Sequence, residues 1–112
     1  MPLYEIPRSI PEVANWDKEA RAKVAGASNA VVAEKFEPGT YTWKVSVVRT
    51  GDPDTLVCYH WAESVDAVVQ HAVAGGFPID FEAIKEVAEP DLSNALWTMG
   101  PGNALASDKA AA

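Results

Sequence analysis

The feature that most constrains the fold of this chain is a pair of strand-like segments joined by a short polar turn. Residues 41–49 alternate aromatic or β-branched side chains with other residues, and residues 55–62 form a second run of the same kind. The intervening residues 50–54 read TGDPD, a composition that is typical of a turn. Two such runs so close together predict an antiparallel β-hairpin.

Helical patterns flank this hairpin in the sequence. The first helix is expected over residues 17–36, with Asn15 or Asp17 as its cap. The second helix is expected to follow residues 63–64 and to end at the Gly-Gly pair of residues 75–76. The apolar stripe that we assign to the first helix consists of Ala20, Val24, Ala27, Val31, Val32 and Phe36.

Two further strands complete the pattern, over residues 3–6, ended by Pro7, and over residues 81–87. The order β, α, β, β, α, β is that of the ferredoxin-like fold. We therefore predict an α+β domain over residues 1–90, with a four-stranded antiparallel sheet and two helices on one face. Residues 91–112 are predicted to be a C-terminal tail with a flexible end, docked in part through Leu96, Trp97 and Met99.

The charge of the chain excludes some partners. Sixteen acidic residues against nine Lys and Arg give the 112 residues a net charge of −7, which disfavours nucleic acid and anionic membrane surfaces. No apolar run approaches the roughly 20 residues that a membrane span requires. Cys58 is the single cysteine and has no intrachain partner, which fits a reducing compartment. We therefore expect a cytoplasmic protein.

The register of the hairpin decides which side chains share a face of the sheet. If Val48 pairs with Leu56, the period of two gathers six residues on one face, namely Trp43, Val45, Val47, Val57, Tyr59 and Trp61. The other face then carries Lys44, Ser46, Val48, Leu56, Cys58 and His60. We expect the first face, which is the more aromatic, to pack against the helices and the second face to be bare.

A bare face of that composition predicts self-association. Leu56, Val48 and Cys58 make it too apolar to face water comfortably. Pairing with the same face of a second copy in a twofold homodimer would cover it and enclose a partly polar cavity. We therefore predict a homodimer of the dimeric α+β barrel type, with a shared pocket.

Three side chains are candidates for metal binding or catalysis. Cys58 and His60 stand two apart on one strand, so they could offer a sulfur and a nitrogen ligand to a transition metal. In the alternative interpretation, Cys58 is a small core residue and His60 is a polar residue at the rim of the sheet. His71 lies about 120° from the centre of its helix's apolar stripe, which favours a solvated flanking histidine over a functional one. Either histidine is a candidate acid or base, because histidine titrates near neutral pH.

Five more hairpin residues are candidates for ligand binding. Lys44 would favour an anionic ligand if it faces the cavity, and is otherwise an exposed strand residue. Ser46 could hydrogen-bond a ligand or only form part of the strand. Trp43, Tyr59 and Trp61 are either core residues or the lining of an aromatic pocket.

A likeness to known proteins rests on a few stretches of sequence, namely YEIPRSIP at residues 4–11, Trp43, VCYHWA at 57–62, HAVAGGFP at 71–78 and Glu86-Val87. Together these stretches resemble a family of small ferredoxin-like proteins, some members of which are identified as nickel-binding or nickel-responsive. Residues 55–71 are also similar to the dimeric α+β barrel proteins, which include cofactor-free monooxygenases, isomerases and haem-degrading enzymes. Both resemblances imply the same fold and a pocket between sheet and helices or between subunits.

Three functions are compatible with these patterns. The leading hypothesis is a homodimeric protein that holds a small molecule or a transition metal such as nickel, with His60 and Cys58 in the site. The second is a cofactor-free enzyme of the monooxygenase, isomerase or cyclase type, acting on a small aromatic or polyketide-like substrate through His60 or His71. The third is a non-catalytic interaction protein that binds its partner through the segment around Trp97.

Overall fold

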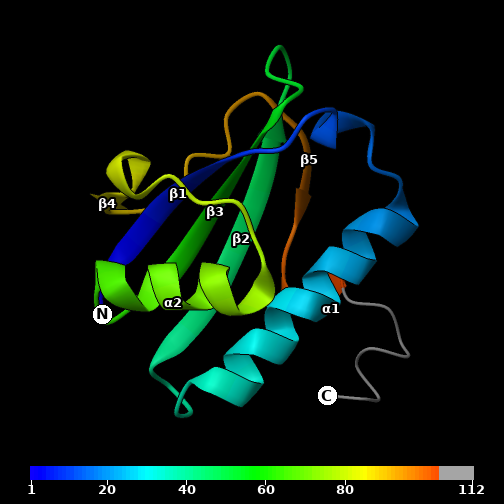
Figure 1. Cartoon of the computed structure of the whole chain (residues 1–112). Coiled ribbons are helices and arrows are strands. Elements are labelled where there is room, and N and C mark those ends of the chain that lie inside the picture. Colours follow the sequence, from blue (N-terminus) through cyan, green and yellow to red (C-terminus); the bar gives the residue numbers. More distant parts are fainter. Residues whose placement is uncertain (104–112) are drawn as a thin grey trace.

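One antiparallel sheet of five strands organises this computed structural model, which describes residues 1–103. The strands and helices are β1 (Leu3–Ser9), α1 (Lys18–Lys35), β2 (Tyr41–Arg49), β3 (Thr55–Ala62), α2 (Val65–Gly75), β4 (Lys85–Val87) and β5 (Ala95–Met99). The strands lie in the order β4-β1-β3-β2-β5. Figure 1 shows both helices in front of the sheet, so the molecule consists of one helical layer on one sheet.

This architecture agrees with the predicted α+β class and corrects its strand count. The first four strands and two helices follow the expected order, which is compatible with a ferredoxin-like arrangement. The sheet has five strands instead of four, because the segment expected to dock as part of a tail forms β5 beside β2. Met99 at the end of β5 is buried. The expected flexible end concerns residues 104–112, which lie outside the described residues.

The central hairpin has the predicted bounds and, between its turn and a β-bulge, the predicted register. Ser46 lies opposite Cys58 and Val47 opposite Val57. A β-bulge between Trp43 and Val45 then shifts the pairing, so that Trp43 instead of Lys44 lies opposite His60. Because a bulge adds one residue to one strand, it reverses the alternation of faces beyond it. Trp43 therefore shares a face with Ser46.

The assignment of the two sheet faces to helices and solvent was wrong. The helices pack on the face that carries Leu56, Cys58 and His60, which is the face expected to be bare. Val57 and Tyr59 belong to the opposite face. The period of two determines which residues are neighbours on a face, but both faces of this hairpin are apolar, so hydrophobicity alone does not say which one the helices cover.

The face opposite the helices is not bare either. Residues 88–94 connect β4 at one edge of the sheet to β5 at the other, and Figure 1 shows this connection passing behind the sheet. The carbonyl oxygen of Asp91 accepts hydrogen bonds from Arg49 Nη2 and, at 3.4 Å, from Tyr59 OH. A second cluster of buried residues lies on this face, namely Leu3, Val47, Val57 and Tyr59.

The two outer strands depart from their expected bounds. β1 runs through Pro7 to Ser9, because β4 pairs only with residues 3–5 and leaves β1 as an edge strand at the proline, where a missing donor is tolerated. The expected strand over residues 81–87 is shortened to β4. Its first part forms a 3-10 turn over Phe81–Ala83, stabilised by the Asp80 side chain, which accepts a hydrogen bond from Glu82 N.

Both helices begin as the sequence predicts. The Asp17 side chain accepts from Ala20 N and the Ser64 side chain from Ala67 N. The buried stripe of α1 is rotated from the expected one, with Ala27 exposed and Ser28 buried. Within residues 1–103, no helix has both the length and the apolar character needed to cross a membrane.

Candidate functional site

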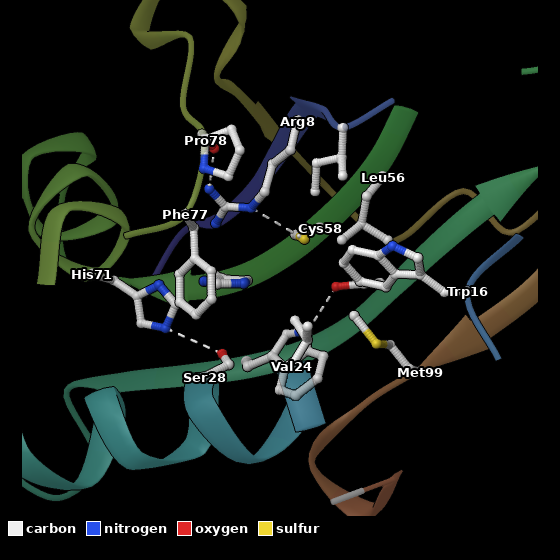
Figure 2. A pocket seen from close by; sticks show the side chains of 14 residues that line it. Arg8, Trp16, Val24, Ser28, Leu56, Cys58, His71, Phe77, Pro78 and Met99 are labelled. Atoms are coloured by element: carbon white, nitrogen blue, oxygen red, sulfur yellow. Dashed lines mark hydrogen bonds between the residues drawn. The ribbon is translucent and has the colours of Figure 1, made fainter. Parts of the chain in front are cut away.

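A cavity of about 190 Å³ lies between the sheet and the two helices. Figure 2 shows its wall, to which β1, β2, β3, β5, both helices and two connecting segments contribute. Most of the lining is apolar, and the polar atoms come from a few buried side chains. The lining residues are Arg8, Ile10, Trp16, Val24, Ser28, Trp43, Ser46, Leu56, Cys58, His60, His71, Phe77, Pro78 and Met99.

Arg8 is the charged residue of this lining. Tyr4, Ile6 and Arg8 alternate along β1, so they share the face that the helices cover. The Arg8 side chain is only 3% exposed. Its Nε donates to Cys58 Sγ at 3.4 Å, and its Nη1 donates to the carbonyl oxygen of Pro78 at 2.7 Å. Figure 2 shows the guanidinium group between these two partners and the ring of Phe77.

The turn that follows α2 places Phe77 and Pro78 against Arg8. Gly76 ends the helix with φ of 69°, a left-handed conformation that glycine adopts at low cost. A Cβ atom on Gly75 would lie 2.2 Å from Phe77 Cε2, so only glycine leaves room for the phenyl ring there. The centroid of this ring lies 5.6 Å from the guanidinium carbon of Arg8, within the range of a cation–π contact.

His60 on β3 is fixed by Tyr41 on β2. Its Nδ1 and the Tyr41 hydroxyl form a hydrogen bond of 2.5 Å, and the side chain is 2% exposed. The pKa of His60 lies well below its usual range, mainly because the ring is buried and to a smaller extent because His71 and Arg8 are close to it. The ring is therefore neutral near pH 7. Burial also raises the pKa of Tyr41, which therefore keeps its proton. Among the described residues, His60 Nε2 forms no hydrogen bond.

His71 on α2 is stacked between two aromatic rings. The ring of Tyr41 lies 4.9 Å away on one side and that of Phe77 5.3 Å away on the other, both nearly parallel to the imidazole. Its Nε2 is hydrogen-bonded to Ser28 Oγ at 3.2 Å, whereas its Nδ1 is buried without a partner in residues 1–103. Burial, and next the charge of Arg8, lower the pKa of His71 to about 4. This ring is also neutral at pH 7.

Trp43 and Ser46 form the side of the cavity nearest β5. The β-bulge brings both side chains to the same face, and Trp43 Nε1 donates to Ser46 Oγ at 2.9 Å. Both residues are buried. The indole donor is therefore satisfied within the chain, and its ring supplies an apolar wall.

Trp16 closes another side of the cavity and is supported by β5. Its ring stacks on that of Trp97 with a centroid distance of 6.4 Å, and Trp97 Nε1 donates to the carbonyl oxygen of Ala14 at 3.2 Å. Arg21 of α1 lies over the other indole, 5.0 Å from the Trp97 ring. Trp97, the residue expected to bind a partner in the third functional hypothesis, thus contacts its own domain.

The structure brings five of the eight sequence-predicted site residues together. Trp43, Ser46, Cys58, His60 and His71 all line the cavity. The interpretation of His71 as a solvated flanking residue was wrong, since it is 1% exposed. The rim position considered for His60 was wrong for the same reason.

The other three candidates lie away from the cavity. Lys44 occupies the β-bulge and is exposed to solvent. Tyr59 and Trp61 belong to the opposite face of the sheet, where Tyr59 OH donates to Glu5 Oε1 at 2.9 Å. Tyr59 and Trp61 lie away from the cavity because the helices cover the other face of the sheet. Lys44 lies away from it because the β-bulge removes this residue from its predicted place opposite His60.

Sequence reasoning missed Arg8, Ser28 and Phe77 as site residues. Arg8 was overlooked because the first strand was ended at Pro7, although the alternation of Tyr4 and Ile6 continues to Arg8. Ser28 lay outside the stripe assigned to the first helix. Phe77 follows the glycine pair that ends the second helix, and no local pattern indicates that its ring folds back onto α2.

The described residues contain no metal-binding cluster of their own. Within residues 1–103 there is no group of three or more His, Cys, Asp or Glu side chains that could hold one. The two predicted ligands are also engaged, Cys58 Sγ with Arg8 and His60 Nδ1 with Tyr41. A guanidinium group beside the sulfur repels a second cation.

Comparison of the chain with protein-family models, with curated proteins and with solved structures found no match.

Proposed function

We propose that this protein binds a small organic molecule in the cavity between its sheet and its helices. The observation that carries the proposal is a cavity with an almost wholly apolar wall, whose lining residues include four polar ones from the sheet, namely Arg8, Ser46, Cys58 and His60. Binding sites for small molecules ordinarily combine an apolar lining with a few placed polar groups. The proposed site lies within a single chain.

The size of the cavity limits the ligand. An apolar cavity of about 150 Å³ is sufficient for benzene. A cavity of about 190 Å³ therefore suits one ring with a small substituent, or a branched chain of the same size. Nucleotides, oligosaccharides and haem are too large for this space.

Binding can be tested with one-ring probes, because Trp16 and Trp43 line the cavity. Benzyl alcohol, benzamide and benzoate would be titrated into the full chain, with tryptophan fluorescence and thermal unfolding as readouts. We expect at least one of them to change the fluorescence and raise the unfolding temperature, since a ligand of the native state stabilises it. If none of the three changes either readout, the proposal is wrong.

A pair of matched substitutions ties the signal to the cavity. Val24→Phe places a ring in the cavity wall, whereas Val73→Phe places the same ring on the exposed side of α2. The first variant should lose the response to the probes and the second should keep it. The reverse pattern would mean that the probes bind elsewhere.

A second candidate function is proton transfer by a cofactor-free enzyme, and the state of His60 favours it. Its Nδ1 is held by Tyr41, which leaves Nε2 as the nitrogen available to the cavity. If Tyr41 donates the hydrogen bond, Nε2 carries the proton and acts as a donor; if Nδ1 donates, Nε2 is a base. The tautomer of His60 thus distinguishes a binding site from a catalytic one.

The catalytic alternative predicts hydrogen exchange at carbon. Cyclohexanone fits the size of the cavity, and its α protons exchange slowly without a catalyst. NMR in heavy water should show faster deuterium incorporation with the native chain than with His60→Gln. Equal rates for the two proteins would eliminate His60 as a base for substrates of this class.

We also propose that the protein forms a homodimer of the dimeric α+β barrel type through the sheet face opposite the helices. Val45, Trp61 and Val87 are apolar, only partly buried there and not covered by a helix. Light scattering with Trp61→Glu tests this: the native chain should have twice the mass of the variant. A native monomer would contradict the dimer without affecting the cavity.

A further inference from the structure

Arg8 brings a positive charge into the cavity wall, and no carboxylate in residues 1–103 pairs with it. Its partners are the thiol sulfur of Cys58 and the carbonyl oxygen of Pro78. The two salt bridges of this part of the chain involve Arg49 and Lys85 instead. Buried charges in proteins are ordinarily paired, because an unpaired one loses its hydration without compensation.

The two histidines and Tyr41 do not balance this charge. His60 and His71 are neutral near pH 7, since burial and nearby positive charge lower the pKa of each. Tyr41, whose pKa is raised by burial, is also uncharged. Arg8 contributes to the shift at all three sites, so its positive field reaches across the cavity.

Two nitrogen atoms of the lining residues have no hydrogen-bond partner in the described part of the chain. Among the described residues, Arg8 Nη2 forms no hydrogen bond, because the two bonds of this side chain use Nε and Nη1. His60 Nε2 is likewise free, and it carries the proton when Tyr41 donates to Nδ1. Hydrogen bonds from a charged donor to an anion are about twice as strong as those between neutral groups.

The charged residue of the wall lies on one side of the cavity. Figure 2 shows Arg8, Pro78 and Phe77 on one side of the cavity and Trp16, Val24 and Met99 on the other. A ligand that satisfies both sides has an anionic group at one end and an apolar body at the other. One guanidinium group matches a single negative charge.

We infer that the ligand is a small monocarboxylate with one ring or a branched apolar body, bound with its carboxylate on Arg8 and His60. This inference rests on the proposed function and specifies its ligand class. Benzoate represents the class. Benzamide is its uncharged counterpart, with the same ring and nearly the same shape.

Calorimetric titration of the full chain with both compounds tests the inference. We expect benzoate to bind about tenfold more tightly than benzamide or better, because the charge-assisted bonds are made only to the anion. In Arg8→Met, which keeps most of the length of the side chain, benzoate should lose this advantage while benzamide still binds. Unpaired buried charge is replaced by an apolar group in this variant, so its fold should be retained.

Arg49→Met is the matched control. It removes an arginine from β2, which β3 separates from β1, and on the opposite face of the sheet, where Arg49 bonds Tyr59 and Asp91. Its preference for benzoate should equal that of the native chain. Circular dichroism of each variant establishes that it is folded before the titration.

The possible outcomes separate the inference from the proposed function. Equal affinities of the native chain for benzoate and benzamide would overturn the monocarboxylate and leave the cavity as a site for neutral molecules. A benzoate preference that survives in Arg8→Met would also overturn it. Binding of neither compound, with no response to benzyl alcohol, would overturn both.

Discussion

Each face of the sheet carries an arginine and a tyrosine hydroxyl, and the partners of the two arginines differ. On the face away from the helices, Arg49 donates to Tyr59 OH at 3.2 Å, and Tyr59 donates to Glu5 at 2.9 Å. Glu5 in turn lies 3.6 Å from Lys85. On the helix face, Arg8 contacts a thiol and a backbone carbonyl but, within residues 1–103, no acid.

This difference indicates that the polar groups on the face away from the helices form a structural network, whereas those on the helix face belong to a binding site. On the first face each cationic side chain has a carboxylate within reach, so the network is satisfied by the chain itself. On the second face, Arg8 is without a counter-ion and His71 Nδ1 without a partner in the described part of the chain. Buried polar groups without partners are rare in folded proteins, and a bound ligand is one way to satisfy them.

The largest expected effect is a loss of stability in acid, which comes from the helix face alone. The pKa of His71 is lowered from 6.5 to about 4, so the unfolded chain takes up a proton at pH values where the folded chain does not. The stability is therefore complete above pH 6.5 and falls as the pH decreases to 4, by about 3 kcal/mol from this residue. Urea unfolding at pH 7, at pH 4 and at values between them measures the loss.

A single substitution assigns this loss to His71. His71→Phe keeps a ring between Tyr41 and Phe77 but removes the titrating group and the unpartnered nitrogen. The variant should be at least as stable as the native chain at pH 7 and lose less stability in acid. An unchanged pH dependence would contradict the contrast between the faces.

The next largest effect is expected from Gly75→Ala, which disturbs the turn that holds Arg8. The added Cβ would lie 2.2 Å from the Phe77 ring, so the ring must leave His71 and Arg8. We expect a loss of about 2 kcal/mol in the free energy of unfolding, as for other overpacked sites. Gly102→Ala is the control, because a Cβ there has open space. Equal losses in both variants would show that Phe77 is not held in place.

Two buried tyrosines, one on each face, allow a direct comparison of the faces. Tyr41→Phe and Tyr59→Phe each remove a hydroxyl that hydrogen-bonds another side chain, and each should cost about 1 kcal/mol. Only Tyr41→Phe should also weaken benzoate binding, because it releases His60 Nδ1. Urea unfolding and calorimetry of both variants measure this. A matching loss of binding in Tyr59→Phe would mean that the faces are coupled.

The smallest effect is expected from Lys85→Ala at the edge of the satisfied network. The Lys85 side chain is 70% exposed, so its pair with Glu5 is screened by solvent. We expect a change of less than about 0.5 kcal/mol, and one that vanishes in high salt. Urea unfolding at low and high salt checks it, and a larger loss would show that the network depends on Lys85.

Much of the fold followed from local patterns. The bounds of β2 and β3, the starts of α1 and α2, and the end of α2 at the glycine pair all match. These features depend on contacts within a few residues, such as the hydrogen bond from Ala67 N to the Ser64 side chain. The pairing of Ser46 with Cys58 was also correct, since a short turn fixes the register of a hairpin.

The site was predicted only in part, because its residues meet through tertiary packing. Cys58, His60 and Ser46 were placed on one face by the period of two, as the structure has them. Arg8 and Pro78 are 70 residues apart, and their hydrogen bond depends on how the turn after α2 returns to β1. No local pattern encodes that return.

The sequence by itself determined the hairpin, the order of the first four strands and both helices, and the set of side chains that share each face between the hairpin turn and the β-bulge. Only the tertiary structure decided which face the helices cover, and with it whether Cys58 and His60 lie in a cavity or on an open sheet. The physical reason is that alternation is a local property of the backbone. The choice between two apolar faces is made by long-range packing of α1 and α2, which no short stretch of sequence contains.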